Sequence, residues 1–179
     1  GHFVYSTLHT NDAPSAITRL VDMGVEPFLV ASSLIGIMAQ RLLRTVCPDC
    51  RESYEAHEEE VREIGLSPEM VGARPKFYRG RGCPHCFDTG YLGRSGIHEL
   101  LLPSDEVRQL ILNNVDSNTI KKAAMAHGMR TLREDGAYVE AGENETRGAV
   151  VARGTLNLDT PAIENLQVIW RAFPKVEGG

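Results

Sequence analysis

Apolar and polar residues follow two different periods along the first 44 residues. Residues 3–8 are mainly β-branched and aromatic, which predicts a buried strand. Asp12 precedes a run with apolar residues at helical spacing, which predicts a helix ending at Gly24. After Pro27 a second helical pattern runs up to Arg44, and its apolar part is typical of a buried helix. The order strand, polar loop, helix, helix indicates one edge of an α/β sheet.

The second half of the chain predicts one strand followed by helices. Residues 97–102 have a strand pattern, and residues 105–112, 117–127 and 131–141 have helical patterns. The candidate signals at their ends are Ser104, Asp116 or Ser117 as N-caps, and Gly128 as a stop. Residues 161–173 fit an amphipathic helix and equally a tail that packs only in a larger assembly.

Residues 45–96 have a different composition from the segments on either side. They contain all four cysteines, and prolines and glycines crowd the same stretch. A segment of this kind cannot bury much apolar core, because its apolar residues are few and its turns are many. A bound metal ion is a physically sensible way to hold it together.

The cysteines form two Cys-x-x-Cys pairs, Cys47 with Cys50 and Cys83 with Cys86. Four thiolates brought into a tetrahedron are the ligand set of a structural zinc site, and they leave no position open for water. Four ordinary buried cysteines and a redox motif are the alternatives, although redox Cys-x-x-Cys motifs come singly. His85 lies inside the second pair, where it either competes as a ligand or faces solvent.

The composition of the chain limits the kinds of partner that it is expected to bind. The formal net charge of −5 disfavours a nucleic-acid partner, and the acidic run 58–60 is typical of a solvated helix face. No apolar run approaches the roughly 18–20 residues of a membrane span. The chain begins without Met and without a signal-peptide pattern, so we take it as a piece of a longer protein.

A small basic and aromatic patch near the second cysteine pair keeps a different function open. Its members are Arg74, Lys76, Phe77, Tyr78, Arg79 and Arg81. Cations beside stacking aromatics favour a non-catalytic zinc-ribbon module that binds nucleic acid, or a protein-docking surface.

His9 lies where the first predicted strand gives way to a polar loop. In open α/β sheets, ligands bind at the carboxyl ends of strands, so this histidine could contact a phosphate or an attacking water. A lone histidine in such a loop is more often a structural hydrogen-bonding group.

Longer strings around these residues resemble a known family. Residues 1–13 resemble the histidine box of the secretion ATPases that drive type II secretion and type IV pilus assembly. The resemblance continues through residues 19–28, 39–42, 82–100 and 128–136, so it covers about residues 1–137. Several motifs in the same order make it specific.

The resemblance implies an α/β fold: the C-terminal part of a RecA-like P-loop ATPase domain, with a tetracysteine zinc subdomain and a helical C-terminal region. It implies a homo-hexamer at the cytoplasmic face of the bacterial inner membrane, using ATP and Mg²⁺ to move a platform protein. By resemblance, His9 is the catalytic candidate that senses the γ-phosphate, and His2 is a hydrogen-bonding support. Arg41 is expected to bridge to nucleotide or to a neighbouring subunit, or to form a helix-surface salt bridge.

The sequence departs from this family in two respects. It contains no Gly-x-x-x-x-Gly-Lys-Ser/Thr phosphate-binding loop and no acidic strand-end motif for Mg²⁺, and we expect both upstream of Gly1. The 179 residues alone are therefore expected to be inactive. The expected division is residues 1–44 for the ATPase core, 45–96 for the zinc subdomain, 97–141 for the helical region and 142–179 for a divergent tail.

Overall fold

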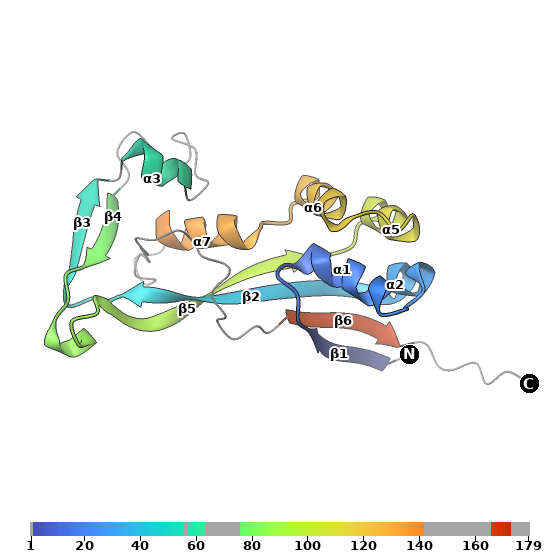
Figure 1. Ribbon diagram of the computed structural model, residues 1–179, viewed down its shortest axis with the longest axis horizontal. Helices are drawn as coiled ribbons and strands as arrows, with labels where there is room; N and C mark the ends of the chain where they lie inside the picture. Colours follow the sequence, from blue (N-terminus) through green and yellow to red (C-terminus); the bar gives the residue numbers. More distant parts are fainter. Residues whose placement is uncertain (1, 56, 64–75, 142–165, 173–179) are drawn as a thin grey trace, which may run out of the picture. The chain divides into compact units, whose positions relative to one another are not determined.

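The computed structural model describes residues 2–55, 57–63, 76–141 and 166–172 (Figure 1). It is a mixed α/β structure, as the sequence predicts. The elements are β1 (His2–Leu8), α1 (Ala13–Asp22), α2 (Pro27–Ser33), β2 (Leu34–Val46), β3 (Arg51–Glu55), α3 (Glu58–Glu63), β4 (Lys76–Gly80), the 3-10 turn η1 (Pro84–Cys86), β5 (Tyr91–Leu101), α5 (Asp105–Leu112), α6 (Ser117–Ala126), α7 (Leu132–Ala141) and β6 (Leu166–Ala172).

The chain divides into two compact units. Unit 1 consists of residues 1–40, 99–131 and 164–179, and unit 2 consists of residues 41–98 and 132–163. The division falls inside two strands, because β2 and β5 each contribute residues to both units.

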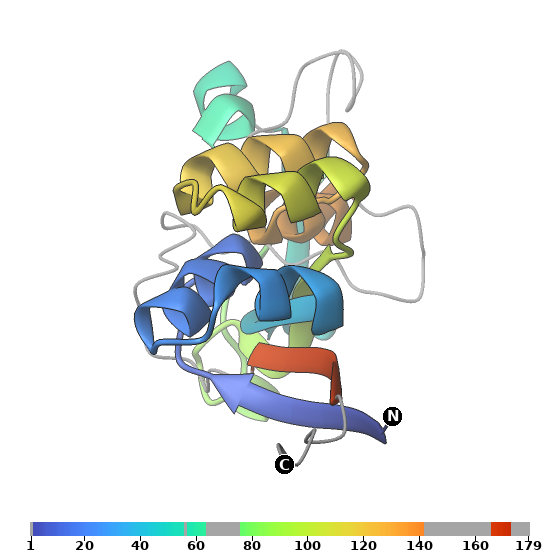
Figure 2. The same ribbon diagram turned by 90° about the vertical axis from the view of Figure 1, so that its right-hand side faces the viewer.

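Unit 1 is built in layers. The strand order of its sheet is β1-β6-β2-β5, and β6 is antiparallel to both β1 and β2. Helices α1 and α2 lie between these strands and the pair α5 and α6, as both views show (Figures 1 and 2). The core forms where the layers meet, from apolar side chains that include Ile17, Leu20, Val30, Leu34, Ile37, Leu101, Val107, Ile111 and Ile120.

The helices of unit 1 begin where the sequence places their caps. The Asp12 side chain accepts a hydrogen bond from the Ser15 backbone N–H at the start of α1, and Ser104 accepts one from Val107 at the start of α5. Asp116, rather than Ser117, caps α6, because its carboxylate accepts from the N–H groups of Asn118 and Thr119. The predicted helices over 105–112 and 117–127 are therefore confirmed to within a residue.

The predicted long helix up to Arg44 is wrong beyond Ser33. Helix α2 stops there, Leu34 takes an extended conformation, and the chain continues as strand β2. Apolar runs do not separate a buried helix from a buried strand by periodicity alone. In the fold, the β-branched residues Ile35 and Ile37 suit a strand that is paired with β6.

The amphipathic helix, one of the two interpretations of residues 161–173, is also wrong for the part that the structure describes. Residues 166–172 form strand β6, which lies between β1 and β2 and hydrogen-bonds to both. Strands β1 and β2 offer hydrogen-bond partners on both sides to the backbone N–H and C=O groups of β6. This pairing outweighs the local helical pattern. Residues 161–165 lie outside the described residues.

Strand β1 is present, but it is not buried as expected. It lies at one edge of the sheet and pairs with β6 alone among the described strands. Its side chains are exposed on both faces, with Phe3 at 68% and Tyr5 at 70%. The apolar pattern predicts the strand correctly, but it cannot say which surface covers it.

Unit 2 contains a small antiparallel pair, β3 with β4, in which Tyr54 lies opposite Phe77. Phe77 is buried and packs on the Tyr54 ring, with 6.2 Å between ring centroids. The acidic run forms the first turn of α3 with Glu58 and Glu59 exposed, which confirms the solvated helix face. The predicted strand over 97–102 corresponds to the end of the longer β5, which stops at Leu101, and α7 matches the predicted helix over 131–141 to within a residue.

Candidate metal centre and histidine loop

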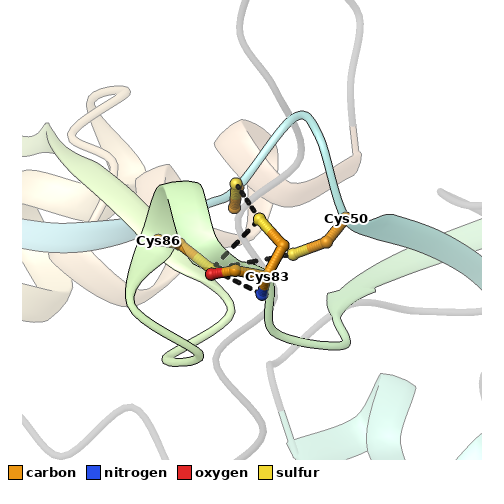
Figure 3. A group of neighbouring side chains, drawn as sticks. Cys50, Cys83 and Cys86 are labelled. Atoms are coloured by element: carbon orange, nitrogen blue, oxygen red, sulfur yellow. Dashed lines mark hydrogen bonds between the residues drawn. The ribbon is translucent and has the colours of Figure 1, made fainter.

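The end of β2, the start of β3 and the turn η1 bring the cysteines together. Cys47 follows the end of β2 and Cys50 directly precedes β3, while Cys83 and Cys86 lie at and in the turn η1. Figure 3 shows Cys50, Cys83 and Cys86 converging from two loops. The long loop between the pairs therefore returns to its starting point, as the predicted zinc site requires.

The sulfur atoms have the spacing of a tetrahedral zinc site. The Sγ–Sγ distances are 3.9 Å for Cys47–Cys83, 3.8 Å for Cys50–Cys86 and 3.6 Å for Cys83–Cys86. With Zn–S bonds of about 2.3 Å, the edge of the tetrahedron is about 3.8 Å. A disulfide needs about 2.05 Å, and all four cysteines are free thiols. The four residues thus fit a metal ion that is held by sulfur alone.

The thiols differ in how readily they lose a proton. Burial acts to raise the pKa of Cys86, but hydrogen bonds from the backbone N–H groups of Cys83 and Gly90 and from neighbouring thiols lower that pKa to about 6. Burial and the neighbouring sulfur atoms raise the pKa of Cys50 to about 12. Crowded thiols cannot all ionise without a compensating charge, and a divalent cation supplies that charge.

Two glycines, Gly80 and Gly90, let the backbone close around the cysteines. A Cβ atom on Gly80 would lie 2.0 Å from the Gly90 carbonyl oxygen, so the two backbones touch where no side chain fits. Gly90 also has a φ of +76°, and its carbonyl accepts a hydrogen bond of 2.9 Å from the Cys47 N–H. The glycine-rich composition was visible in the sequence, but the role of this particular pair was not.

The ends of β2 and β5 meet beside the same turns. The Arg44 guanidinium lies over the Tyr91 ring, 4.2 Å from its centroid, so a cation–π contact flanks the cysteine loops. His85 is exposed, which is one of the two outcomes that the sequence left open, and its Nδ1 atom is hydrogen-bonded to the Asp49 carboxylate. Cys47, Asp49 and His85 also form a second group of possible ligands whose atoms lie within 4.8 Å of one another.

The histidine loop belongs to unit 1. His9 is exposed and directly follows β1. The loop ends at Asp12, which caps α1 and accepts a hydrogen bond of 3.0 Å from the Lys121 ammonium group of α6. Burial acts to raise the pKa of Asp12, but hydrogen bonds from Ser15 and Lys121 and the Lys121 charge hold it below its ordinary value of 3.8.

Glu99 is a residue near this loop that the sequence reasoning missed. Its side chain is 1% exposed, and its carboxylate accepts a hydrogen bond of 2.8 Å from the Ala13 N–H at the first turn of α1. A signal was available, because Ile97, Glu99 and Leu101 lie on one face of β5 and all three are buried. A carboxylate on the buried face of an apolar strand indicates a specific partner.

His2 and His9 do not meet within this chain. They lie at opposite ends of the seven-residue strand β1, which corresponds to roughly 23 Å at about 3.3 Å per residue. Arg41 lies in β2 and is buried, so the helix-surface location that one of its expected roles required is wrong.

The basic and aromatic patch is largely engaged inside unit 2. Phe77 is buried, the Arg79 guanidinium lies 5.6 Å from the Tyr54 ring centroid, and Arg81 forms an ion pair with Glu52. A buried ring cannot stack on a nucleic-acid base, and cations that are already paired contribute less to binding phosphate. Arg74 and the side chain of Lys76 lie outside the described residues.

Within the described residues, no helix has both the length and the apolar character needed to cross a membrane.

Comparison with known proteins places these features in a family. Residues 1–151 match the family described as Type II/IV secretion system protein. The chain is 49% identical over 154 residues to the type IV pilus assembly ATPase PilB of Thermus thermophilus, covering 86% of this chain and 17% of that protein. It is 48% identical over 136 residues to type II secretion system protein E of Pseudomonas aeruginosa, covering 76% of this chain and 26% of that protein.

A third relative agrees with these two. The type II secretion system ATPase E of Vibrio cholerae is 47% identical over 140 residues, which cover 76% of this chain and 26% of that protein. The chain thus spans about a quarter or less of the length of these relatives. Because the family match covers far more than half of the sequence, the chain belongs to the type II/IV secretion system protein family.

Proposed function

We propose that this chain is part of an ATPase that powers type II secretion or type IV pilus assembly. The observation that carries the proposal is the identity of nearly one half to relatives named as the ATPases of such systems. In this proposal the whole protein contains a RecA-like domain, binds ATP and Mg²⁺, and works as a hexamer on the cytoplasmic side of the inner membrane. Its partner there is an inner-membrane platform protein.

The proposed division of labour follows the expected regions. Residues 1–44 contribute to the ATPase core, residues 45–96 form a zinc subdomain, and residues 97–141 form a helical region. The phosphate-binding loop and the Mg²⁺-binding carboxylate are to come from the rest of the protein, because residues 1–179 contain neither motif. This chain by itself should therefore not hydrolyse ATP, and measurable hydrolysis by the purified 179 residues would contradict the proposal.

Zinc is proposed as a structural ion held by Cys47, Cys50, Cys83 and Cys86. The support is the sulfur spacing, which matches a tetrahedron with no ligand position left for water. When bound, the ion supplies positive charge that keeps four thiolates together. The protein contributes the rigid turns and the backbone N–H groups that hydrogen-bond to sulfur. Metal analysis should find about one zinc ion per chain.

His9 is proposed to act near the γ-phosphate, with His2 and Arg41 in supporting roles. The support is the place of His9, which is exposed immediately after β1 on a loop that Asp12 and Glu99 hold at its far end. A neutral or protonated imidazole there can hydrogen-bond to a phosphate oxygen or to the attacking water. Since His2 lies at the other end of β1, it is proposed to support the strand by hydrogen bonding rather than to contact the same phosphate.

The test is the ATPase rate of the complete protein with His9→Ala. We expect kcat to fall roughly 10²-fold or more with nucleotide binding retained, because a single positioned hydrogen-bonding or proton-transfer group contributes that much. His127→Ala is the matched control, because His127 is an exposed histidine of unit 1 that pairs with Glu106. An unchanged kcat in the His9 variant would remove the catalytic role, while leaving the family assignment in place.

A further inference from the structure

The two cysteine turns repeat one four-residue pattern. Residues 47–50 read Cys-Pro-Asp-Cys and residues 83–86 read Cys-Pro-His-Cys. In the structure they lie in register, since each of the three contacts joins residues 36 positions apart: Cys47 with Cys83, Asp49 with His85, and Cys50 with Cys86. The one position at which the turns differ therefore brings an acid opposite a histidine.

The Asp49 and His85 side chains contact each other outside the sulfur cluster. They are 54% and 61% exposed, whereas Cys47 and Cys86 are buried. In this contact the His85 Nδ1–H group is the donor and the Asp49 carboxylate is the acceptor. Four sulfur atoms already complete a tetrahedron, which leaves neither side chain with a required place as a ligand.

The contact joins two turns that are far apart in sequence. Residues 51–82, a stretch of 32 residues, separate the second cysteine from the third. Bringing the ends of such a loop together costs conformational entropy. Any contact between the turns that does not need the metal reduces the entropy lost when the metal binds. The Arg81 N–H donates 3.1 Å to the Cys50 carbonyl as a backbone contact of this kind.

We propose that Asp49 and His85 form a latch that holds the two Cys-Pro-x-Cys turns in register for metal binding. The latch rests on the proposed zinc site and adds to it a pair of positioning residues that bind no metal themselves. Its chemistry is an exchangeable acid–histidine hydrogen bond, so the two partners should work equally well with their positions reversed. That symmetry gives the proposal a sharp test.

The experiment measures zinc affinity of the 179-residue chain by competition with a chelator, for wild type, Asp49→Ala, His85→Ala and the reciprocal double variant Asp49→His with His85→Asp. Each single variant should raise the Kd about three- to tenfold, between the contribution of an exposed ion pair and that of a residue that orients a metal ligand through a hydrogen bond. The reciprocal variant should recover most of the loss. Glu106→Ala, which breaks the exposed pair with His127 in unit 1, should leave the zinc Kd unchanged.

Cobalt(II) substitution distinguishes a His85 that belongs to the latch from a His85 that binds the metal. For a latch, the visible spectrum of the cobalt-loaded protein should be that of four sulfur ligands in wild type and in His85→Ala alike. A wild-type spectrum with a nitrogen ligand that is lost in His85→Ala would overturn the latch and make His85 a ligand, as its closeness to Cys47 permits. Tight wild-type binding with unchanged single variants would overturn the latch alone. A wild-type chain that takes up no metal would overturn the zinc site and the latch together.

Discussion

At the scale of single residues, two carboxylates organise the start of helix α1 and with it the end of the histidine loop. The first backbone N–H groups of a helix have no partner within the helix. Here Glu99 from β5 accepts from Ala13, and Asp12 accepts from Ser15. Lys121 from α6 then contacts Asp12, so three elements of unit 1 meet where the loop carrying His9 ends. The end of the loop that carries His9 is therefore held by residues from β5 and α6 that are distant from it in sequence.

Glu99→Ala should destabilise the protein by about 1–3 kcal/mol, because it leaves the buried Ala13 N–H without its acceptor. Glu99→Gln keeps a carbonyl oxygen at the same place and should cost less. Urea-induced unfolding of the two variants and wild type measures the difference. Equal losses in the alanine and glutamine variants would show that the Ala13 hydrogen bond is not the reason for burying Glu99.

Asp12→Asn should make the free energy of unfolding depend less on pH in the acidic range. The pKa of Asp12 is lower in the folded protein than its ordinary value of 3.8, so the unfolded state binds more protons near that pH. The stabilising contribution is therefore present above about pH 4 and is lost as the pH falls through the folded pKa. Asparagine can still cap α1 but cannot attract Lys121.

The stability gap between wild type and Asp12→Asn should consequently be largest at neutral pH, about 0.5–1 kcal/mol, and should shrink below pH 4. Unfolding curves at pH 7 and pH 3 measure it. The same gap at both pH values would mean that the charge of Asp12 contributes nothing.

At the scale of elements, the cysteine turns depend on backbone packing as much as on sulfur. Gly80 at the end of β4 and Gly90 just before β5 approach so closely that neither leaves room for a side chain. This contact sets the distance between the end of the small sheet and the start of β5. The turn carrying Cys83 and Cys86 lies in the sequence between those two glycines, so their contact closes the loop that presents the thiols.

Gly80→Ala should weaken both folding of unit 2 and zinc binding, since the added Cβ would lie 2.0 Å from the Gly90 carbonyl oxygen and the backbones must separate. Such overpacking typically costs about 1–3 kcal/mol. Gly93→Ala is the control, because its Cβ meets open space and only the φ of +82° opposes it, at about 1 kcal/mol. Thermal unfolding and zinc competition should rank Gly80→Ala as the more damaging change. The reverse order would show that the close approach is not important.

At the scale of the whole molecule, each of the two units is stabilised internally by different means. Unit 1 has an apolar core shared between its sheet and four helices. Among the residues that the structure describes, unit 2 has a smaller set of buried apolar residues, which includes Val46, Phe77 and Ile97, together with the cysteine cluster. Removing metal should therefore affect one unit much more than the other.

Chelation of the zinc should increase amide hydrogen exchange in residues 41–55 and 76–98 of unit 2, with little change in α1, α5 and α6 of unit 1. Hydrogen exchange read out by mass spectrometry measures both units in one sample. The zinc-loaded protein and a sample that is chelated and then reloaded serve as controls. A uniform increase along the chain would show that the metal supports the whole fold rather than unit 2.

The sequence by itself determined the features whose causes are local. Helices α5 and α6 and their caps follow from residues within one or two turns. The convergence of the two Cys-x-x-Cys pairs is not local, but their ligand chemistry predicts it, since a structural zinc site takes four such ligands. Only the tertiary structure decided between helix and strand for β2 and β6, because the deciding hydrogen bonds come from strands distant in sequence. The tertiary structure also decided the hydrogen bond of Glu99 to Ala13 and the pairing of Asp49 with His85. The local pattern around a residue does not indicate a partner that is distant in sequence.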